Sequence, residues 1–229
     1  RGGVLGTAPE TDLVALRVFS GEEGASGDTL AALVYAAKVG CDAANLSLGY
    51  PLPYVYPDEY PELLEIAEMY DRAVEYARER EMVVVNSAGN DALDMSPENV
   101  LSLPTEVPGV FGVSATGPVG FLWDDEPPIE EFALHPRKLR EEPSQPAVYT
   151  NYGHGVDVSA AGGNYDPEAL AEAEDGDDDN PEWYYDLVFS TVFETAEDGA
   201  KSADYGWKAG TSMAAPQVTG AVALVRSLR

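Results

Sequence analysis

Apolar and polar residues alternate along this chain with two different periods, and each change of period marks an expected helix or strand. Between residues 58 and 79 the apolar positions recur at three- and four-residue steps, which predicts an amphipathic helix. Its buried face comprises Leu63, Ile66, Ala67, Tyr70, Val74 and Ala77. Residues 28–39 predict a second helix, with Ser26 or Asp28 as its N-cap. Residues 212–228 are apolar nearly all round and predict a central, buried helix.

Shorter apolar runs predict strands between these helices. Residues 82–88 form a near-continuous β-branched run, typical of a strand buried on both faces. Residues 11–19 alternate apolar and polar positions and also predict a strand. Three further candidates are 43–49, 109–115 and 155–160. Because strands and helices alternate, the expected fold class is α/β, with a mainly parallel sheet between two layers of helices.

Two segments depart from this pattern and are interpreted as surface insertions on a compact scaffold. Residues 118–147 are proline-rich and charged, and residues 163–186 are acidic. A structural calcium ion is one interpretation of the oxygen-rich stretch 174–182. That stretch lacks the ligand spacing of a defined calcium loop, so a solvated acidic loop is the favoured interpretation. No other metal and no organic cofactor is expected.

The charge balance narrows the range of partners. The chain has 229 residues, with 41 Asp and Glu against 13 Lys and Arg, and a net charge of −28. Such a surface repels nucleic acid and anionic membranes, so neither is an expected partner, and we expect a monomer. Adaptation to high salt is favoured over simple solubility as the reason for the acidity.

Cys41 is the single cysteine, which excludes a disulfide within the chain and predicts a small core residue. No stretch of the sequence reaches transmembrane length.

The stretch AGTSMAAPQV, residues 209–218, carries the clearest candidate chemistry. It places Ser212 in the first turn of an apolar helix, near the positive end of the helix dipole. Unpaired backbone N–H groups at such a terminus can hold a developing oxyanion. Pro216 is acceptable so close to the start of a helix. Simple N-capping by Thr211 or Ser212 is the alternative interpretation.

Gly210-Thr211-Ser212-Met213-Ala214-Ala215-Pro216 resembles the nucleophile motif of the subtilisin-like serine proteases. Four other segments resemble blocks of the same family, in family order: residues 2–19, 44–49, 82–91 and 148–162. The resemblance covers nearly the whole chain except the two insertions. It implies a subtilisin-like three-layer αβα fold, with residues 1–229 forming part of a peptidase domain that is truncated at both ends.

The resemblance also implies roles for individual residues. Ser212 would be the nucleophile, and Asn90 would supply the side-chain donor of the oxyanion hole. From the residues alone, a turn residue after a strand is the favoured interpretation of Asn90. Substrate backbone and the side chain before the cut would bind Ser47, Leu48, Gly49, Ser87, Ala88 and Gly89. The small size of the last three implies a roomy pocket for a large apolar or aromatic side chain, and Asp91 adds some preference for basic ones.

The family's aspartate and histidine motifs, D-[ST]-G and H-G-T-H-V-A-G, do not occur in this sequence. The resemblance of residues 2–9 to the segment after the histidine helix places both partners upstream of Arg1. His135 and His154 are the only histidines, and a solvated loop residue is the favoured interpretation of each. The chain alone is therefore expected to be inactive, although its parent would be a secreted endopeptidase acting on polypeptides.

Two other functions compete with this interpretation. The first is a catalytically dead pseudoenzyme that binds peptides or regulates another protein. The second is an esterase of the α/β-hydrolase kind. The G-x-S-x-G elbow is absent, because Ala214 stands two residues after Ser212, and no aspartate or histidine follows that serine.

Overall fold

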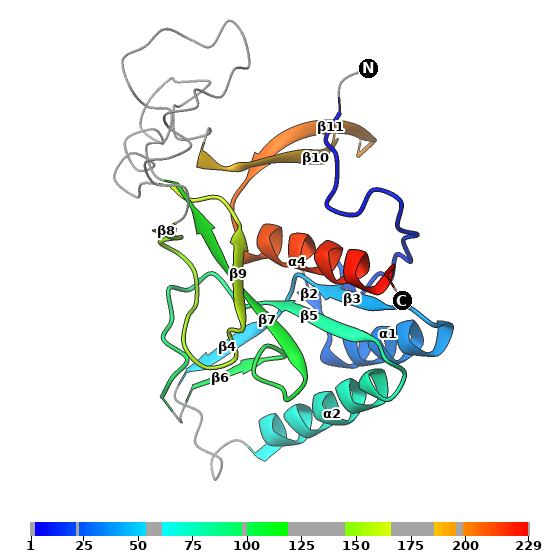
Figure 1. Ribbon diagram of the computed structural model, residues 1–229. Helices are drawn as coiled ribbons and strands as arrows, with labels where there is room; N and C mark the ends of the chain where they lie inside the picture. Colours follow the sequence, from blue (N-terminus) through cyan, green and yellow to red (C-terminus); the bar gives the residue numbers. More distant parts are fainter. Residues whose placement is uncertain are drawn as a thin grey trace, which may run out of the picture.

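The computed structural model describes residues 3–21, 23–53, 61–97, 100–118, 145–165, 186–195 and 199–228. The centres of both predicted insertions, the acidic stretch 174–182 and His135 lie outside these described residues. A mainly parallel sheet forms the middle of the molecule (Figure 1). Its strands follow the order β3 (Ala43–Leu46), β5 (Val83–Ser87) and β7 (Val110–Gly117), and each neighbouring pair is parallel.

Two more strands pair with the far edge of β7. The first is β9 (Val158–Ala161), which is parallel to β7. The second is β8 (Gln145–Pro146), which is antiparallel to the end of β7. The strands predicted at 43–49, 82–88, 109–115 and 155–160 are therefore confirmed, each within a few residues of its expected bounds.

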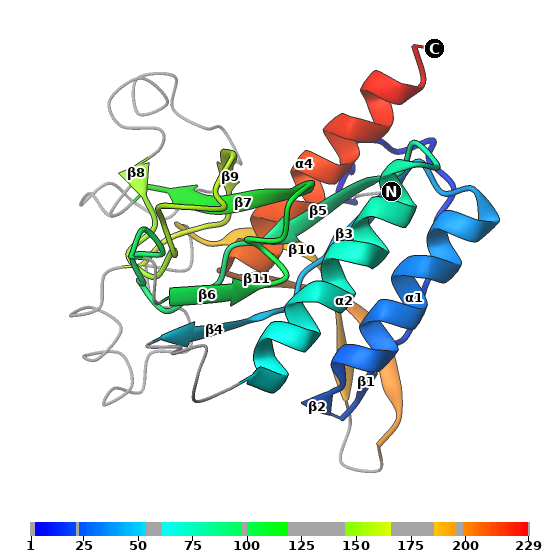
Figure 2. The same cartoon turned by 90° about the horizontal axis from the view of Figure 1, so that it is seen from below.

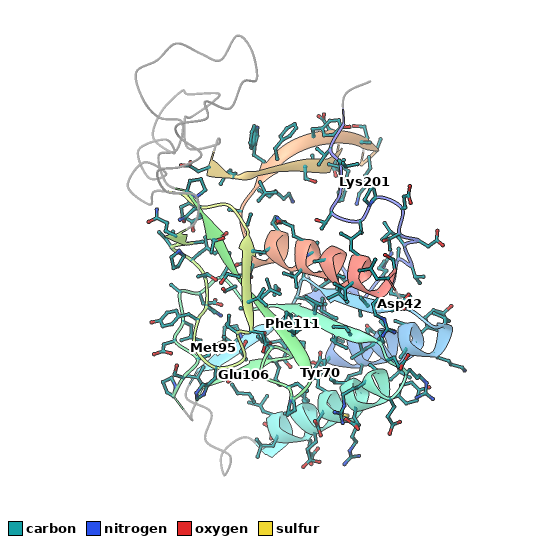
Figure 3. All side chains as sticks on the ribbon, viewed as in Figure 1. Asp42, Tyr70, Met95, Glu106, Phe111 and Lys201 are labelled. Atoms are coloured by element: carbon teal, nitrogen blue, oxygen red, sulfur yellow. The ribbon has the colours of Figure 1, made fainter. Side chains whose placement is uncertain are left out.

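Helices cover both faces of this sheet, as the alternation of elements predicts. Figures 1 and 2 show α1 (Ser26–Val39) and α2 (Pro61–Arg78) on one face and α4 (Thr211–Arg226) on the other. Tyr70 points from α2 toward the sheet (Figure 3), and it is buried with Val74 and Ala77 as the helical period predicts. This three-layer α/β arrangement positions the ends of β3 and β5 beside the start of α4.

Two hydrophobic clusters hold the layers together. One lies between the sheet and α1 and α2, and includes Leu33, Tyr70 and Val84. The other lies under α4, where Ala214 and Ala215 pack on strand residues of β5 and β7. Cys41 is half-buried at the edge of the first cluster.

The prediction of a strand over residues 11–19 is wrong for all but its last residue. Only Phe19 enters a strand, β1 (Phe19–Ser20), which pairs with β2 (Glu23–Gly24). The preceding residues have no strand partner within the described parts of the chain, and Leu13 is 91% exposed. A strand persists only where a neighbour satisfies its backbone N–H and C=O groups, and an alternating sequence cannot supply that neighbour.

The prediction that the last helix is buried throughout is also wrong. Thr211, Ala214 and Ala215 are buried, whereas Val225 and the following Leu228 are exposed, Leu228 to 87%. Val218 and Val222 still pack against the second cluster, and the end of α4 projects beyond the strands (Figure 2). Apolar composition alone therefore overstates the burial of this helix.

Both suggested N-caps of α1 are wrong as well. The helix begins at Ser26, and its N-cap is Ala25, which makes no side-chain cap hydrogen bond. The Ser26 hydroxyl instead lies 3.1 Å from that of Tyr50. Asp28 stands in the first turn, where its negative charge favours the helix dipole.

Two antiparallel ribbons were not predicted. In the first, β4 (Tyr50–Pro53) pairs with β6 (Val100–Leu103). In the second, β10 (Val188–Thr195) pairs with β11 (Lys201–Lys208), and β11 leads directly into α4. The sequence pattern does not indicate β4, because Pro51 and Pro53 stand in it. Proline is found in edge strands and not in central strands.

Candidate active site

A cavity of about 350 Å³ opens where the ends of β3 and β5 meet the start of α4. The carboxyl ends of parallel strands commonly form such binding crevices. The chain segments after β3 and β5 supply two of its walls, and the first turn of α4 supplies the third. Its lining residues are Ser47, Leu48, Gly49, Tyr50, Pro51, Ser87, Ala88, Gly89, Asn90, Asp91, Ser102, Thr105, Thr211 and Ser212.

Ser212 is the second residue of α4 and is half-buried at the cavity. Among the described residues, neither its hydroxyl nor its backbone N–H has a hydrogen-bond partner. Its carbonyl oxygen accepts a hydrogen bond from the Ser47 hydroxyl at 2.9 Å. The hydroxyl and an N–H at the positive end of the helix are thus both available to a ligand.

The N-capping interpretation of this stretch is wrong. The N-cap of α4 is Gly210, and no side chain caps the helix. Gly210 has a φ of +150°, in the range that favours glycine. Its N–H donates to Gly162 O at 2.9 Å and to the Tyr149 hydroxyl at 2.9 Å. Burial raises the pKa of that Tyr149 hydroxyl, so it stays neutral and anchors the approach to Ser212.

Asn90 faces the same cavity from the segment after β5. Its Oδ1 accepts two hydrogen bonds from Thr211, one from the backbone N–H and one from the hydroxyl, each at 2.9 Å. Because both donors require an oxygen at that position, the side-chain amide is oriented unambiguously. The Nδ2 group has no partner among the described residues and remains free to donate.

All six residues predicted to bind substrate line this one cavity together with Ser212 and Asn90. The Ser47 hydroxyl accepts a hydrogen bond from Asn45 Nδ2 at 3.0 Å, which fixes the first wall. Gly49 has a φ of +146°, and a Cβ there would lie 2.7 Å from Leu103 O. In the second wall Ser87 and Ala88 are buried, and Thr105 Oγ1 donates to Ser87 O at 3.2 Å.

Five lining residues were not predicted as part of a site: Tyr50, Pro51, Ser102, Thr105 and Thr211. Tyr50, Pro51 and Ser102 belong to the β4–β6 ribbon, in which Pro51 pairs with Ser102. Their contribution depends on how two distant segments pair, so no local motif indicates it. The sequence predicts Thr211 only as a cap, whereas in the structure it contacts Asn90.

His154 does not line the cavity. It is exposed. Hydrogen bonds from Ser96 lower the pKa of the nearby Asp94 carboxyl group, and His154 adds a smaller lowering. His154 also has a small lowering influence on the pKa of Glu106. Burial outweighs that influence at Glu106 and raises the pKa of its carboxyl group (labelled in Figure 3). Within the described ranges, the only ionisable acid or base at the cavity is Asp91, apart from the phenol of Tyr50.

Among the described residues there is no group of three or more His, Cys, Asp and Glu side chains arranged to hold a metal ion. No helix in the part of the chain that the structure covers is long and apolar enough to cross a membrane.

The fold and the cavity define a subtilisin-like α/β protein. The Epidermin Leader Peptide Processing Serine Protease from Staphylococcus aureus matches it with a TM-score of 0.66 and 22% identity, over 96% of this chain and 48% of that one. The profile of the subtilase family (peptidase S8) matches residues 1–229, and the chain belongs to that family.

Curated relatives agree with this assignment. Subtilisin BL from Lederbergia lenta is 27% identical over 225 residues, which is 98% of this chain and 56% of that protein. The major intracellular serine protease of Bacillus subtilis is 27% identical over 229 residues, covering 99% of this chain and 50% of that protein. The chain thus spans about half the length of these relatives.

Proposed function

We propose that the protein is a serine endopeptidase in which Ser212 attacks a peptide carbonyl. The observation that carries this proposal is that Ser212 and Asn90 line one cavity, each with polar groups that have no hydrogen-bond partner among the described residues. Ser212 presents an unpaired hydroxyl and N–H at the start of α4, and Asn90 presents an unpaired Nδ2 that Thr211 holds in place. Membership of the subtilase family supports the same chemistry.

The attack forms a bond between the serine oxygen and the carbonyl carbon, and it moves negative charge onto the carbonyl oxygen. Asn90 Nδ2 and the Ser212 N–H would donate hydrogen bonds to that oxygen, and the positive end of α4 adds to the stabilisation. The proton of Ser212 must pass to a base and then to the leaving amine. That base would come from outside the described residues that line the cavity.

The walls of the cavity suit an extended peptide. Residues 47–49 follow the open end of β3 and offer backbone groups for pairing with a substrate strand. The same cavity is lined by the small residues Ser87, Ala88 and Gly89, and by the neutral residues Ser102 and Thr105. We therefore expect a large apolar or aromatic side chain before the scissile bond, with Asp91 at the rim favouring basic residues to a smaller extent.

Secretion and a monomeric state are further proposals for this protein. The acidic surface supports the monomeric state, because strong self-repulsion opposes association. A relative from Xanthomonas campestris that is named an extracellular protease supports secretion. The curated relatives include an intracellular protease, so the family allows either location.

The test uses the protein produced from its complete gene. Wild type should hydrolyse peptides and be labelled by a fluorophosphonate, whereas Ser212→Ala should not be labelled. Its residual rate should fall to no more than about 10,000-fold over the uncatalysed reaction. Ser227→Ala, at the exposed end of the same helix, serves as the control and should keep wild-type rates.

Two results would overturn this proposal. An unlabelled but folded wild type that still binds peptides would favour the pseudoenzyme instead. Rapid labelling of Ser212 in residues 1–229 alone would show a base within this chain, contrary to our expectation.

A further inference from the structure

Asn151 is fully buried, with 0% of its surface exposed. Its side-chain hydrogen bonds join it to residues 88–93, the loop that carries Asn90. Its Oδ1 accepts hydrogen bonds from Asp91 N at 2.9 Å and from Leu93 N at 3.0 Å. Its Nδ2 donates to Ala88 O at 3.0 Å and to Asp91 Oδ2 at 3.3 Å. These contacts fall on both sides of Asn90 in the sequence but not on Asn90 itself.

The backbone around Asn151 reinforces the same connection. Asn151 N donates to Gly89 O at 3.1 Å. Gly89 has a φ of +104°, and a Cβ at this position would collide with Asn151 Nδ2. The two segments are therefore packed so closely that only glycine fits between the strand end and the asparagine.

Asn90 is thus held from two directions. Thr211 on α4 fixes its side-chain oxygen, and Asn151 fixes the backbone from which the side chain extends. An oxyanion donor is effective only when it is oriented before the charge develops, because reorientation during the reaction costs free energy. A buried asparagine that satisfies four backbone and side-chain groups supplies that rigidity.

We propose that Asn151 is a positioning residue for the oxyanion hole, acting through Asn90 without contact with substrate. This inference rests on the function proposed above. Replacing Asn151 by alanine removes the partner of Ala88 C=O in a buried setting and of Asp91 N–H and Leu93 N–H in a partly buried one. The loop then relaxes, and Asn90 Nδ2 loses its alignment with the Ser212 N–H.

A double-mutant cycle in the protein from the complete gene tests this role. Asn151→Ala should lower kcat by up to about 100-fold, the scale expected for a misplacement of about 1 Å, with little change in KM. In the Asn90→Ala background the same substitution should change kcat by less than about twofold, because the group it positions is already gone. Losses that multiply in the double variant, or that appear mainly in KM, would overturn the proposal.

Asn164→Ala is the matched control. Asn164 is also 0% exposed, and it does not line the cavity. Its Oδ1 accepts a hydrogen bond from Val148 N at 2.9 Å, and its Nδ2 donates one to Gly117 O at 3.2 Å. It should lose a comparable amount of stability but keep kcat per folded molecule. Equal losses of kcat in both variants would mean that Asn151 is merely structural.

A second measurement does not depend on activity. Amide hydrogen exchange at Asp91 and Leu93 should accelerate at least about tenfold in Asn151→Ala relative to Asn164→Ala at matched global stability. Unchanged protection at both amides would overturn the positioning role even if the protein hydrolyses peptides. Accelerated exchange in a protein with no peptidase activity would support Asn151 as the loop anchor and refute only the proposed function.

Asn151→Asp provides a second test in case Asn151→Ala does not fold. An aspartate retains the acceptor for Asp91 N and Leu93 N but brings a second carboxylate to Asp91 Oδ2. Adding Asp91→Asn removes that repulsion and should recover part of the lost kcat. No recovery, with both variants folded, would count against the contact as the source of the effect.

Discussion

Thr211 and Asn90 are joined by two hydrogen bonds, from the threonine N–H and hydroxyl to Asn90 Oδ1, each 2.9 Å long. The threonine hydroxyl also accepts Gly89 N–H at 3.1 Å. Thr211 is 0% exposed and immediately precedes Ser212. The residue next to the candidate nucleophile therefore sets the orientation of the candidate oxyanion donor, so the two groups cannot move independently.

Thr211→Val should reduce kcat in the protein from the complete gene, with a smaller effect on KM. Valine keeps the shape and the backbone N–H but removes the hydroxyl, which leaves Gly89 N–H unpaired. The free energy of unfolding should fall by about 1–3 kcal/mol, the usual cost of an unsatisfied buried group. Thr211→Ser retains the hydroxyl and should preserve most of kcat. Steady-state kinetics and urea unfolding measure both, and equal rates in the two variants would contradict the role.

Asn90→Ala should lower kcat by about 100- to 1000-fold, a magnitude established on a member of this family for the loss of one oxyanion donor. Asn90 is exposed, so the midpoint of thermal unfolding should change little. The affinity for a substrate-like peptide should also be preserved, because the donor acts on charge that appears only in the transition state. An undiminished kcat would show that Nδ2 does not face the reacting carbonyl.

Glu106→Gln should alter the pH dependence of stability. Burial raises the pKa of Glu106, and the hydrogen bond from Ser102 N–H at 2.6 Å opposes this only in part. Because the folded pKa lies above the unfolded one, the stabilising contribution is full below the unfolded pKa and is lost as the pH rises through the folded pKa. Glutamine does not ionise, so it escapes that loss.

Relative to wild type, the glutamine variant should therefore be more stable at about pH 7 than at about pH 4. The gain should be less than about 1.4 kcal/mol per unit of pKa, since the half-buried site is partly screened by solvent. Urea unfolding at the two pH values measures the difference. A constant difference between variant and wild type would show that Glu106 has an ordinary pKa.

Salt should stabilise this protein. The net charge of −28 creates self-repulsion in the folded state, and at about 1 M salt the screening length falls to about 3 Å. The unfolding temperature should therefore rise from low to molar potassium chloride. Sucrose of equal osmolality is the control, because it leaves the charges unscreened. An unfolding temperature that does not change with salt concentration would indicate that the acidity serves solubility alone.

Sequence patterns identified the elements whose signal is local. The helical periods of α1 and α2 and the β-branched run of β5 lie within single segments, so their secondary structure follows from neighbouring residues. The motifs around Ser212 and Asn90 are also continuous in sequence. Their resemblance to one family predicts a common site for both residues.

Tertiary structure decided what depends on distant partners. Residues 11–18 have the alternation of a strand but no neighbour within the described chain, and the end of α4 is apolar but projects past the sheet. Asn90 meets Thr211 across 121 positions, and Asn151 meets Asp91 across 60. Hydrogen bonds of this kind form only after the strands pair and the layers pack. The sequence by itself therefore determined the family and the candidate reacting groups, whereas only the folded chain determined which buried side chains contact the segments that carry them.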